Sequence, residues 1–271
     1  MRAEIEKFFF DNKIEYFSCA SYGDLYELSP EIMAREGFTP KSTIVFLVPY
    51  YVSKPKNISV YAVSLDYHII LRTITDGLIS LLSEIYPDNH FRGYGDHSPI
   101  DEVGAALIGG LGLRGDNGLL INEKYGSYVF IGDVVTDVLP EELGAVKLPI
   151  KECLHCKRCL NACPTGILRG ESGECLSAIT QKKGELSEYE IALMKRCNTV
   201  WGCDFCQSAC PYNEKAGKTP IEFFYEQRIE CLTSDILLSL DKKILRERAF
   251  GWRGRKVVER NLKALKHQIS K

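Results

Sequence analysis

No segment of the 271-residue chain approaches the roughly 18 consecutive apolar residues that a membrane-spanning helix needs. The chain opens MRAEIEKFFFDNKIEYF, which lacks the apolar segment of a secretory signal. It also has no repeat of fixed period and no low-complexity tract, and its net charge of −2 gives no overall basicity that would demand a nucleic-acid partner. These absences predict a folded protein of the cytoplasm with no membrane partner.

Cysteine is abundant instead, and nine of the eleven cysteines lie between Cys153 and Cys210. The first run has the spacing C-x-x-C-x-x-C-x-x-x-C-P, which is typical of [4Fe–4S] proteins and in which the fourth thiolate can serve a second cluster. The second run, C-x-x-C-x-x-x-C-P, repeats this pattern with its first ligand displaced. The runs comprise Cys153, Cys156, Cys159 and Cys163, then Cys203, Cys206 and Cys210. We therefore predict two [4Fe–4S] clusters that form an electron relay.

Three other uses of cysteine compete with this interpretation. Structural zinc sites also use CxxC pairs, but they usually separate the pairs by a dozen or more residues. Disulfide scaffolds are typical of small secreted proteins. A thiol–disulfide couple needs one CxxC pair rather than an array. The spacing favours iron–sulfur clusters over all three.

Hydrophobic periodicity predicts both helices and strands in the remainder of the chain. The expected helices cover 1–17, 66–86 and 101–112, and the expected strands cover 42–49, 58–63, 119–122 and 128–132. The last two strands are joined by a turn at 123–126. Alternating strands and helices before residue 148 favour an α/β layer domain.

The predicted fold is therefore α+β or α/β in three parts. An N-terminal α/β cofactor-binding domain covers 1–148, a ferredoxin-like double [4Fe–4S] domain covers 149–215, and a short basic helical tail covers 216–271. From residue 241 onward the tail has eleven Lys/Arg and three acidic residues. Either it neutralises RNA phosphates, with Phe250 and Trp252 as stacking groups, or it is a solvated helix that packs on the body. The packed side chains would be Val257, Val258, Leu262 and Leu265.

Further motifs precede and follow the cysteine array. They are DYHIILR at 66–72, GDHSPIDE at 95–102, GLGLRGDN at 110–117, the segment from LIN to GD at 120–133, RAF at 248–250 and RNL at 260–262. Together with the cysteines, including the isolated Cys175, they make residues 42–265 resemble the epoxyqueuosine reductase family. Members of that family are cobalamin- and double-[4Fe–4S]-dependent enzymes of tRNA modification. The chain departs from the family in a shorter N-terminal region, a tail without room for helical repeats, and Asp116 in place of the usual lysine. We expect a member shortened at both ends.

In two-cluster ferredoxins the fourth cysteine of each run binds the other cluster, and this rule predicts which cysteines bind each cluster here. One cluster would be held by Cys153, Cys156, Cys159 and Cys210, and the other by Cys163, Cys175, Cys203 and Cys206. Cys197 competes with Cys175 for one ligand position, and the resemblance favours Cys175. Cys19 and Cys231 are expected to be small buried apolar side chains.

The resemblance also implies a cobalamin in the N-terminal domain. The D-x-H-x-x-G pattern of histidine-ligated cobalamin proteins is absent, because Leu71 stands where glycine belongs. This agrees with a corrinoid lacking a histidine ligand and equally with no corrinoid. The glycine-rich segment 109–118 would let the backbone approach a bulky cofactor, or it is a plain helix end and turn. The expected cofactor contacts are Tyr67, His68, His97, Gly110, Gly112, Gly115 and Asn117.

Asp96 is the expected catalytic residue. Reduction of an epoxide to an alkene expels oxygen, which must take up protons, so a positioned acid is needed. The competing interpretation is a helix N-cap, because Asp96 and Ser98 precede a predicted helix with Glu102 in its first turn. The resemblance favours the acid.

The expected function is reduction of epoxyqueuosine to queuosine in tRNA, with electrons from an external donor such as ferredoxin or flavodoxin. Two alternatives remain open. One is a ferredoxin-like electron-transfer protein, and the other is a paralogous corrinoid reductase with a different substrate.

Overall fold

The computed structural model describes residues 2–266, and the chain divides into two compact units. The first unit contains the chain up to Pro49 together with His68–His155. The second contains Tyr50–Tyr67 and the chain from Cys156 onward. Residues 1 and 267–271, at the ends of the predicted first helix and of the predicted tail, lie outside the described residues. The three-part division expected from the sequence stays a prediction.

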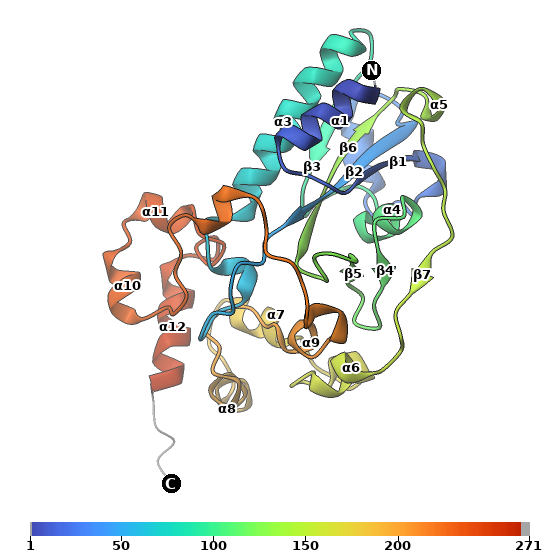
Figure 1. The fold of residues 1–271 in the computed structure, drawn as a ribbon. Helices are drawn as coiled ribbons and strands as arrows, with labels where there is room; N and C mark the ends of the chain where they lie inside the picture. The colour runs from blue at the N-terminus through green and yellow to red at the C-terminus, as the bar shows by residue number, and fades with distance from the viewer. Residues whose placement is uncertain (1, 267–271) are drawn as a thin grey trace. The chain divides into compact units, whose positions relative to one another are not determined.

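A four-stranded antiparallel sheet in the order β1-β2-β6-β3 forms the centre of the first unit (Figure 1). Its strands are β1 (Phe17–Ser21), β2 (Ser42–Pro49), β3 (Phe91–Tyr94) and β6 (Val129–Thr136). Every residue of β2 is buried, because this central strand is covered on both faces. That double burial explains the uninterrupted apolar run that predicted the strand.

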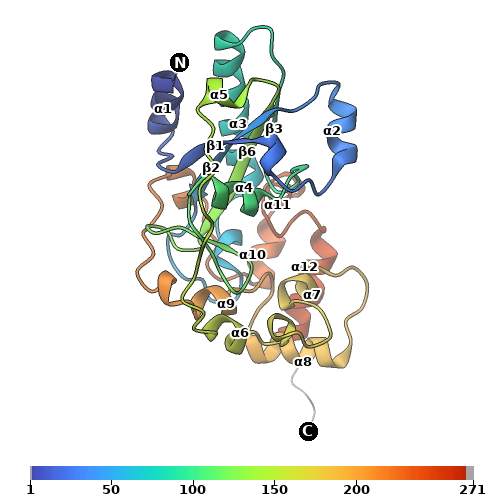
Figure 2. The same cartoon turned by 90° about the vertical axis from the view of Figure 1, so that its right-hand side faces the viewer.

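Helices cover both faces of this sheet (Figures 1 and 2). Val45 and Leu47 of β2 pack with Ala105 and Leu107 on one face. On the opposite face Phe46 lies against Phe9, with ring centroids 5.4 Å apart. The alternation follows from the two-residue period of a strand. The helices of the unit are α1 (Arg2–Asp11), α2 (Pro30–Glu36), α3 (Tyr67–Ile85), α4 (Glu102–Ile108) and α5 (Pro140–Leu143), and the first residue of α3 belongs to the second unit.

A smaller sheet in the order β5-β4-β7 leads toward the first cysteine. Its strands are β4 (Leu113–Arg114), β5 (Leu120–Ile121) and β7 (Lys151–Glu152). β7 runs parallel to β4, and the backbone N–H of Cys153 donates to the carbonyl of Arg114 at 3.0 Å. The glycine-rich segment and the start of the cysteine array therefore lie side by side within this unit.

The predicted strand at 42–49 and the predicted helix at 66–86 are confirmed. The predicted strand at 58–63 is wrong, because Val60–Ala62 forms a 3-10 turn and only Ile58 bridges to Trp201. The strands expected at 119–122 and 128–132 exist, but they belong to different sheets, and the isolated bridge between Asn122 and Gly126 closes the turn that separates them. The strands β1 and β3 were not predicted, because their short sequences, FSCAS and FRGY, carry little apolar alternation.

The second unit consists of short helices and loops around an apolar core. Trp201, Phe250 and Val258 are fully buried in this core. Residues 50–67 contribute Ile58, Ala62 and Val63 to it, although they are far from the other members in sequence. The helices are α6 (Arg158–Ala162), α7 (Leu176–Gln181), α8 (Glu188–Cys197), α9 (Phe205–Ser208), α10 (Ser234–Ser239), α11 (Lys242–Arg246) and α12 (Arg255–Lys266).

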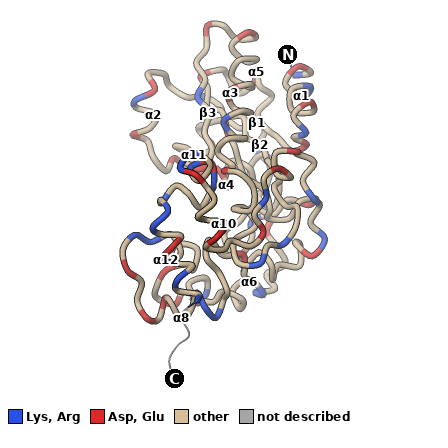
Figure 3. Tube along the Cα trace, turned by 90° about the vertical axis from the view of Figure 1, so that its left-hand side faces the viewer, with Lys and Arg blue, Asp and Glu red and all other residues tan. Residues whose placement is uncertain are grey.

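The basic tail packs on the second unit through α12, whose Lys and Arg positions are marked in Figure 3. Its packing face is the predicted set Val257, Val258, Leu262 and Leu265. The packed-helix interpretation is thus confirmed. The expectation that Phe250 is a stacking group for RNA is wrong, because this ring is fully buried, whereas Trp252 is 57% exposed. Among the described residues no helix is both long and apolar enough to cross a membrane.

Candidate functional site

The cysteines of the second unit lie on short helices and the loops that follow them. Cys159 is buried in α6, and Cys210 is buried just after α9. α6 packs against α9, so the parts of the two cysteine runs that belong to the second unit lie next to each other, although 39 residues separate the runs in sequence.

Cys163 is surrounded by hydrogen-bond donors. Burial acts to raise the pKa of its thiol, but hydrogen bonds from the Thr165 hydroxyl and from the backbone N–H groups of Leu168, Thr165 and Gly166 together lower it. The Thr165 hydroxyl lies 3.5 Å from the sulfur. Donors aimed at cysteine sulfur stabilise the thiolate that iron requires, and they tune the reduction potential of a bound cluster.

Cys203 lies close enough to Cys175 and Cys206 to be influenced by their charges. Burial, followed by repulsion from these two thiolates, raises the pKa of Cys203 to about 12. Cys175 is exposed at the start of α7, whereas Cys197 is half-buried at the end of α8, where burial raises its pKa. The neighbourhood of Cys203 therefore supports Cys175 as its partner, and the choice between Cys175 and Cys197 stays a prediction.

The spacing of the thiols fits clusters better than single zinc ions. Within residues 2–266, metal-binding side-chain atoms gather in a set of three within 4.8 Å of one another at Asp116, Cys153 and His155, and no three cysteines do so. Four thiolates around one zinc lie about 3.8 Å apart, because each Zn–S bond is about 2.3 Å. A cubane binds each thiolate through a different iron and needs wider spacing. The arrangement of the described thiols thus gives no support to single zinc ions, and a donor set made of thiolates is the one that [4Fe–4S] clusters take.

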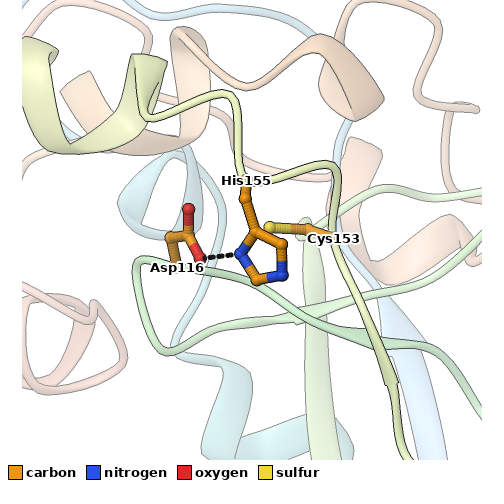
Figure 4. A group of neighbouring side chains, drawn as sticks. All are labelled: Asp116, Cys153 and His155. Atoms are coloured by element: carbon orange, nitrogen blue, oxygen red, sulfur yellow. Dashed lines mark hydrogen bonds and ion pairs between the residues drawn. The ribbon is translucent and has the colours of Figure 1, made fainter.

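Cys153 in the first unit has an acid and a histidine beside it (Figure 4). The Asp116 carboxylate lies 2.7 Å from His155 Nδ1, and Glu152 lies 3.0 Å from Nε2. The hydrogen bond and charge of Asp116, followed by Glu152, raise the pKa of His155. A histidine held between two carboxylates tends to keep its proton, and a protonated imidazole cannot bind a metal. We therefore interpret this group as an ion-pair network next to the first predicted cluster ligand.

Asp96 lies in the loop between β3 and α4. Its backbone adopts the left-handed region with φ of 69°, and its side chain is 63% exposed. The carboxylate lies 3.6 Å from His68 Nε2 in the second residue of α3. Asp96 and His97 line an open pocket of about 270 Å³ that belongs wholly to the first unit. The N-cap of α4 is Asp101, so the competing interpretation of Asp96 as that cap is wrong.

Two further carboxyl groups lie at this loop. The backbone N–H of Asp96 donates to Glu102 Oε1 at 3.2 Å. Burial, opposed by this hydrogen bond and reinforced by the charges of Asp96 and Asp101, raises the pKa of Glu102 to about 7. Asp133 is fully buried in β6, and burial followed by the charge of Glu102 raises its pKa well above the ordinary value. Neither residue was assigned a chemical role from the sequence. The sequence signal that could have pointed to Asp133 is the presence of an acidic residue within the apolar segment YVFIGDVVT.

The remaining predicted cofactor contacts have structural roles of their own. A Cβ atom on Gly110 would lie 2.6 Å from Leu148, and one on Gly112 would lie 2.5 Å from the Ile121 carbonyl. A Cβ atom on Gly115 would lie 2.5 Å from Asn117 Oδ1, the oxygen that accepts from the N–H of Leu119. The chain's own packing thus accounts for these glycines. Tyr67 belongs to the second unit, where its ring contacts Tyr61 edge-on. The cofactor role of these residues stays a prediction.

A family described as a 4Fe-4S double cluster binding domain matches residues 152–213. Epoxyqueuosine reductases are similar to a larger part of the chain. The enzyme of Listeria monocytogenes is 33% identical over 211 residues, which is 73% of this chain and 53% of that protein. The enzyme of Lactococcus garvieae is 34% identical over 209 residues, or 73% of this chain and 57% of that protein. The chain thus spans about half the length of the curated relatives it matches.

Solved structures share the fold over nearly the whole chain. An epoxyqueuosine reductase from Streptococcus thermophilus aligns with a TM-score of 0.76 and 24% identity, covering 98% of this chain and 80% of that one. An epoxyqueuosine reductase with a tRNA-Tyr epoxyqueuosine-modified stem loop aligns with a TM-score of 0.77 and 21% identity, covering 97% and 80%. The double-cluster match and the mixed helix–strand architecture confirm the predicted fold class and the predicted iron–sulfur cofactors. Over the three quarters of its length that align with the curated relatives, this chain belongs to the epoxyqueuosine reductase family.

Proposed function

We propose that the protein is a cytoplasmic oxidoreductase that converts epoxyqueuosine to queuosine in tRNA. The observation that carries this proposal is the 33% identity to an epoxyqueuosine reductase over an alignment of 211 residues, far longer than the 152–213 cluster domain. Similarity limited to 152–213 would favour a plain ferredoxin-like electron carrier. Here the similarity extends well beyond the cluster domain. We therefore propose that the residues outside 152–213 form the site at which the substrate is reduced.

The proposed reaction has a simple balance. An epoxide takes up two electrons and two protons, both C–O bonds break, and an alkene and water are formed. The protein must therefore supply electrons one at a time and must hold an acid near the departing oxygen. The cysteines serve the first requirement, and the loop at Asp96 serves the second.

The clusters, when bound, supply single electrons at low potential. We assign one to Cys153, Cys156, Cys159 and Cys210, and the other to Cys163, Cys175, Cys203 and Cys206. The close packing of α6 on α9 and the donors around Cys163 support this assignment. Cys203 also lines an open pocket with Lys54 and Lys56. A small external donor of the ferredoxin or flavodoxin type would reach the second cluster at such a surface.

Asp96 is the proposed proton donor. It is exposed in a pocket, it does not cap α4, and its left-handed backbone conformation is uncommon outside glycine. Residues held in such conformations often serve function. A Bacillus subtilis epoxyqueuosine reductase has been described with an aspartate catalytic loop swung out of its active site. His68, 3.6 Å away, would stabilise the carboxylate that remains after the proton has left.

Cobalamin is the proposed second cofactor and, when bound, would supply the reducing centre at the substrate carbon. The pocket of about 270 Å³ is too small to enclose a corrinoid. Its open side and the exposure of His68 and His97 leave room for a large cofactor to lie against it. We therefore propose contacts from His68 and His97, and Tyr67, Gly110, Gly112, Gly115 and Asn117 remain predicted contacts.

The proposal is tested with protein reconstituted under anaerobic conditions. Iron, sulfide and bound corrinoid are measured, and an epoxyqueuosine-bearing tRNA stem loop is assayed by mass spectrometry for loss of one oxygen. We expect two clusters, about one corrinoid per chain, and queuosine as product. The Asp96→Asn variant is expected to lose at least about 100-fold in turnover while it keeps its iron.

The matched control is Glu84→Gln, which removes an exposed carboxylate on α3. It should leave turnover unchanged. Full clusters without corrinoid affinity or turnover would instead establish the electron-transfer alternative. Turnover that survives in Asp96→Asn would contradict the assignment of the acid.

A further inference from the structure

The loop that carries Asp96 is held at two points by carboxyl groups. At one end, the Asp96 N–H donates to Glu102 Oε1 at 3.2 Å. At the other, the Ser98 hydroxyl lies 3.2 Å from Asp133 Oδ2 and accepts from the N–H of Ile100 at 3.4 Å. Asp96 also has the unusual φ of 69°, so its backbone needs support from its surroundings.

Asp133 lies at the centre of the sheet, opposite Val45 on β2 and Tyr94 on β3. It shares a strand face with Ile131, which packs toward α4, the helix that begins at Glu102. Its side chain is fully buried, and its Oδ1 atom has no hydrogen-bond partner among the described residues. An ionised carboxylate without a cation or a full set of donors is very costly in such a place. Asp133 is therefore expected to carry a proton.

The ionisable groups around Glu102 and Asp133 are mostly acidic. Those that influence Glu102 are Asp96 and Asp101, and those coupled to Asp133 are Glu102, Tyr22 and Tyr94. Tyr22 bonds Glu27, and Tyr94 bonds Glu36, which pairs with Arg92. Two imidazoles lie at the loop: His97 lines the pocket with Asp96, and His68 faces the Asp96 carboxylate. Close carboxyl groups in such surroundings cannot all ionise near neutral pH.

We propose that Glu102 is the positioning residue for Asp96, and that Asp133 beneath it keeps a shared proton in this carboxyl cluster at neutral pH. The proposal rests on the proposed role of Asp96 as proton donor. Glu102 holds the Asp96 backbone at the pocket, where both side chains meet solvent. The cluster would let Asp96 regain a proton from water after each turnover, because a negative charge on Glu102 beside it favours the protonated form of Asp96. The raised pKa of Glu102, about 7, is consistent with this state.

A purely structural role for Glu102 is the alternative. An acid in the first turn of α4 also interacts favourably with the helix dipole. Such a role would affect stability, but it would not affect the Asp96 amide or the titration of the loop. Two substitutions separate these possibilities. Glu102→Gln keeps an oxygen acceptor for the Asp96 N–H and removes the ionisation, whereas Glu102→Ala removes both.

The first measurement is hydrogen exchange of residues 95–101 in cluster-loaded protein, followed by mass spectrometry. We expect Glu102→Ala to speed exchange at Asp96 about tenfold, because the side-chain oxygen that accepts from the Asp96 N–H is lost. Glu102→Gln should remain close to the parent protein, and so should the control Glu84→Gln. Unchanged exchange in Glu102→Ala would overturn the positioning role.

The second measurement is infrared absorption of protonated carboxyl groups across the pH range. The parent protein should show a carboxylic acid band that disappears with a midpoint near pH 7, and Glu102→Gln should lack this transition. If the transition near pH 7 persisted in Glu102→Gln, or were absent from the parent protein, the proposal of a shared proton would be wrong. Neither measurement requires turnover, so both remain decisive if the proposed reductase activity fails.

The third measurement is the pH dependence of kcat. With Glu102→Gln we expect the fall in kcat at high pH to move down by about one unit, because glutamine lacks the negative charge that helps Asp96 to keep its proton at high pH. An unshifted profile in an active variant would contradict the proton-holding role. Loss of turnover in the parent protein would sink the proposed function alone.

Discussion

The two units use side chains of different chemistry on different kinds of scaffold. In the first, the candidate groups are carboxylates and an imidazole placed by a sheet and by helices from distant parts of the sequence. In the second, they are thiols on helices of four to six residues and on loops, and among the predicted cluster ligands Cys153 alone belongs to the first unit. Cluster ligation depends on the spacing of cysteines along the sequence, whereas the protonation of an acid depends on its burial and on neighbouring charges. The thiol sites can therefore be recognised in a sequence, and the acid site requires the tertiary structure.

The largest expected effect separates two cysteines of the second unit. We expect Cys175→Ser to lose about half of the bound iron and sulfide, because one of two clusters loses a ligand. Cys197→Ser should keep the full content. Iron and sulfide analysis after anaerobic reconstitution decides between them. The reverse result would assign Cys197 as the ligand in place of Cys175.

A smaller effect compares two aromatic side chains of the tail. Phe250→Ala should lower the free energy of unfolding by about 3–5 kcal/mol, because it leaves a cavity in the core of the second unit. Trp252→Ala should cost under about 1 kcal/mol, since Trp252 is exposed and makes a cation–π contact with Arg253. Anaerobic chemical denaturation of both cluster-loaded variants checks the difference. Equal losses would mean that the tail does not pack as described.

The smallest effect is a pH dependence of stability that arises in the first unit. Glu102 has a folded pKa of about 7 against an ordinary value of 4.5, so the folded state binds the proton more tightly. The resulting stabilisation is complete below about pH 4.5 and is lost as pH rises to about 7. At pH 8, Glu102→Gln should therefore be more stable than the parent protein by about 1–2 kcal/mol, a figure reduced for partial exposure.

Thermal unfolding at pH 5 and pH 8 measures this difference. The two proteins should differ little at pH 5 and should diverge at pH 8. Parallel stability curves would show that Glu102 titrates normally. The Glu84→Gln control, on the same unit, should follow the parent protein at both values.

Much of the fold was predictable where burial is uniform or strongly periodic. β2 was recognised because all eight of its residues are buried, and α3 because its apolar residues recur over about five turns. The segment 58–63 was misassigned because its apolar residues pack against Trp201 and not across a sheet. β3 was missed because Gly93 interrupts it, and a glycine is needed there because a Cβ atom would lie 2.6 Å from Thr75 of α3.

The same distinction applies to the candidate sites. Asp96 was identified by resemblance, but its competing role as an N-cap was removed only when Asp101 was seen to begin α4. Glu102 and Asp133 lie 31 positions apart in sequence and meet at one loop because β6 pairs with β3. The network of Asp116 and His155 forms because β7 runs beside β4.

The sequence by itself determined the cluster chemistry, because the ligand spacing C-x-x-C-x-x-C-x-x-x-C-P is a property of neighbouring residues. The tertiary structure alone decided which carboxyl groups are buried, which residue caps α4 and which tail aromatic is exposed. These properties depend on solvent exclusion and on charges from distant segments, and no local pattern records them.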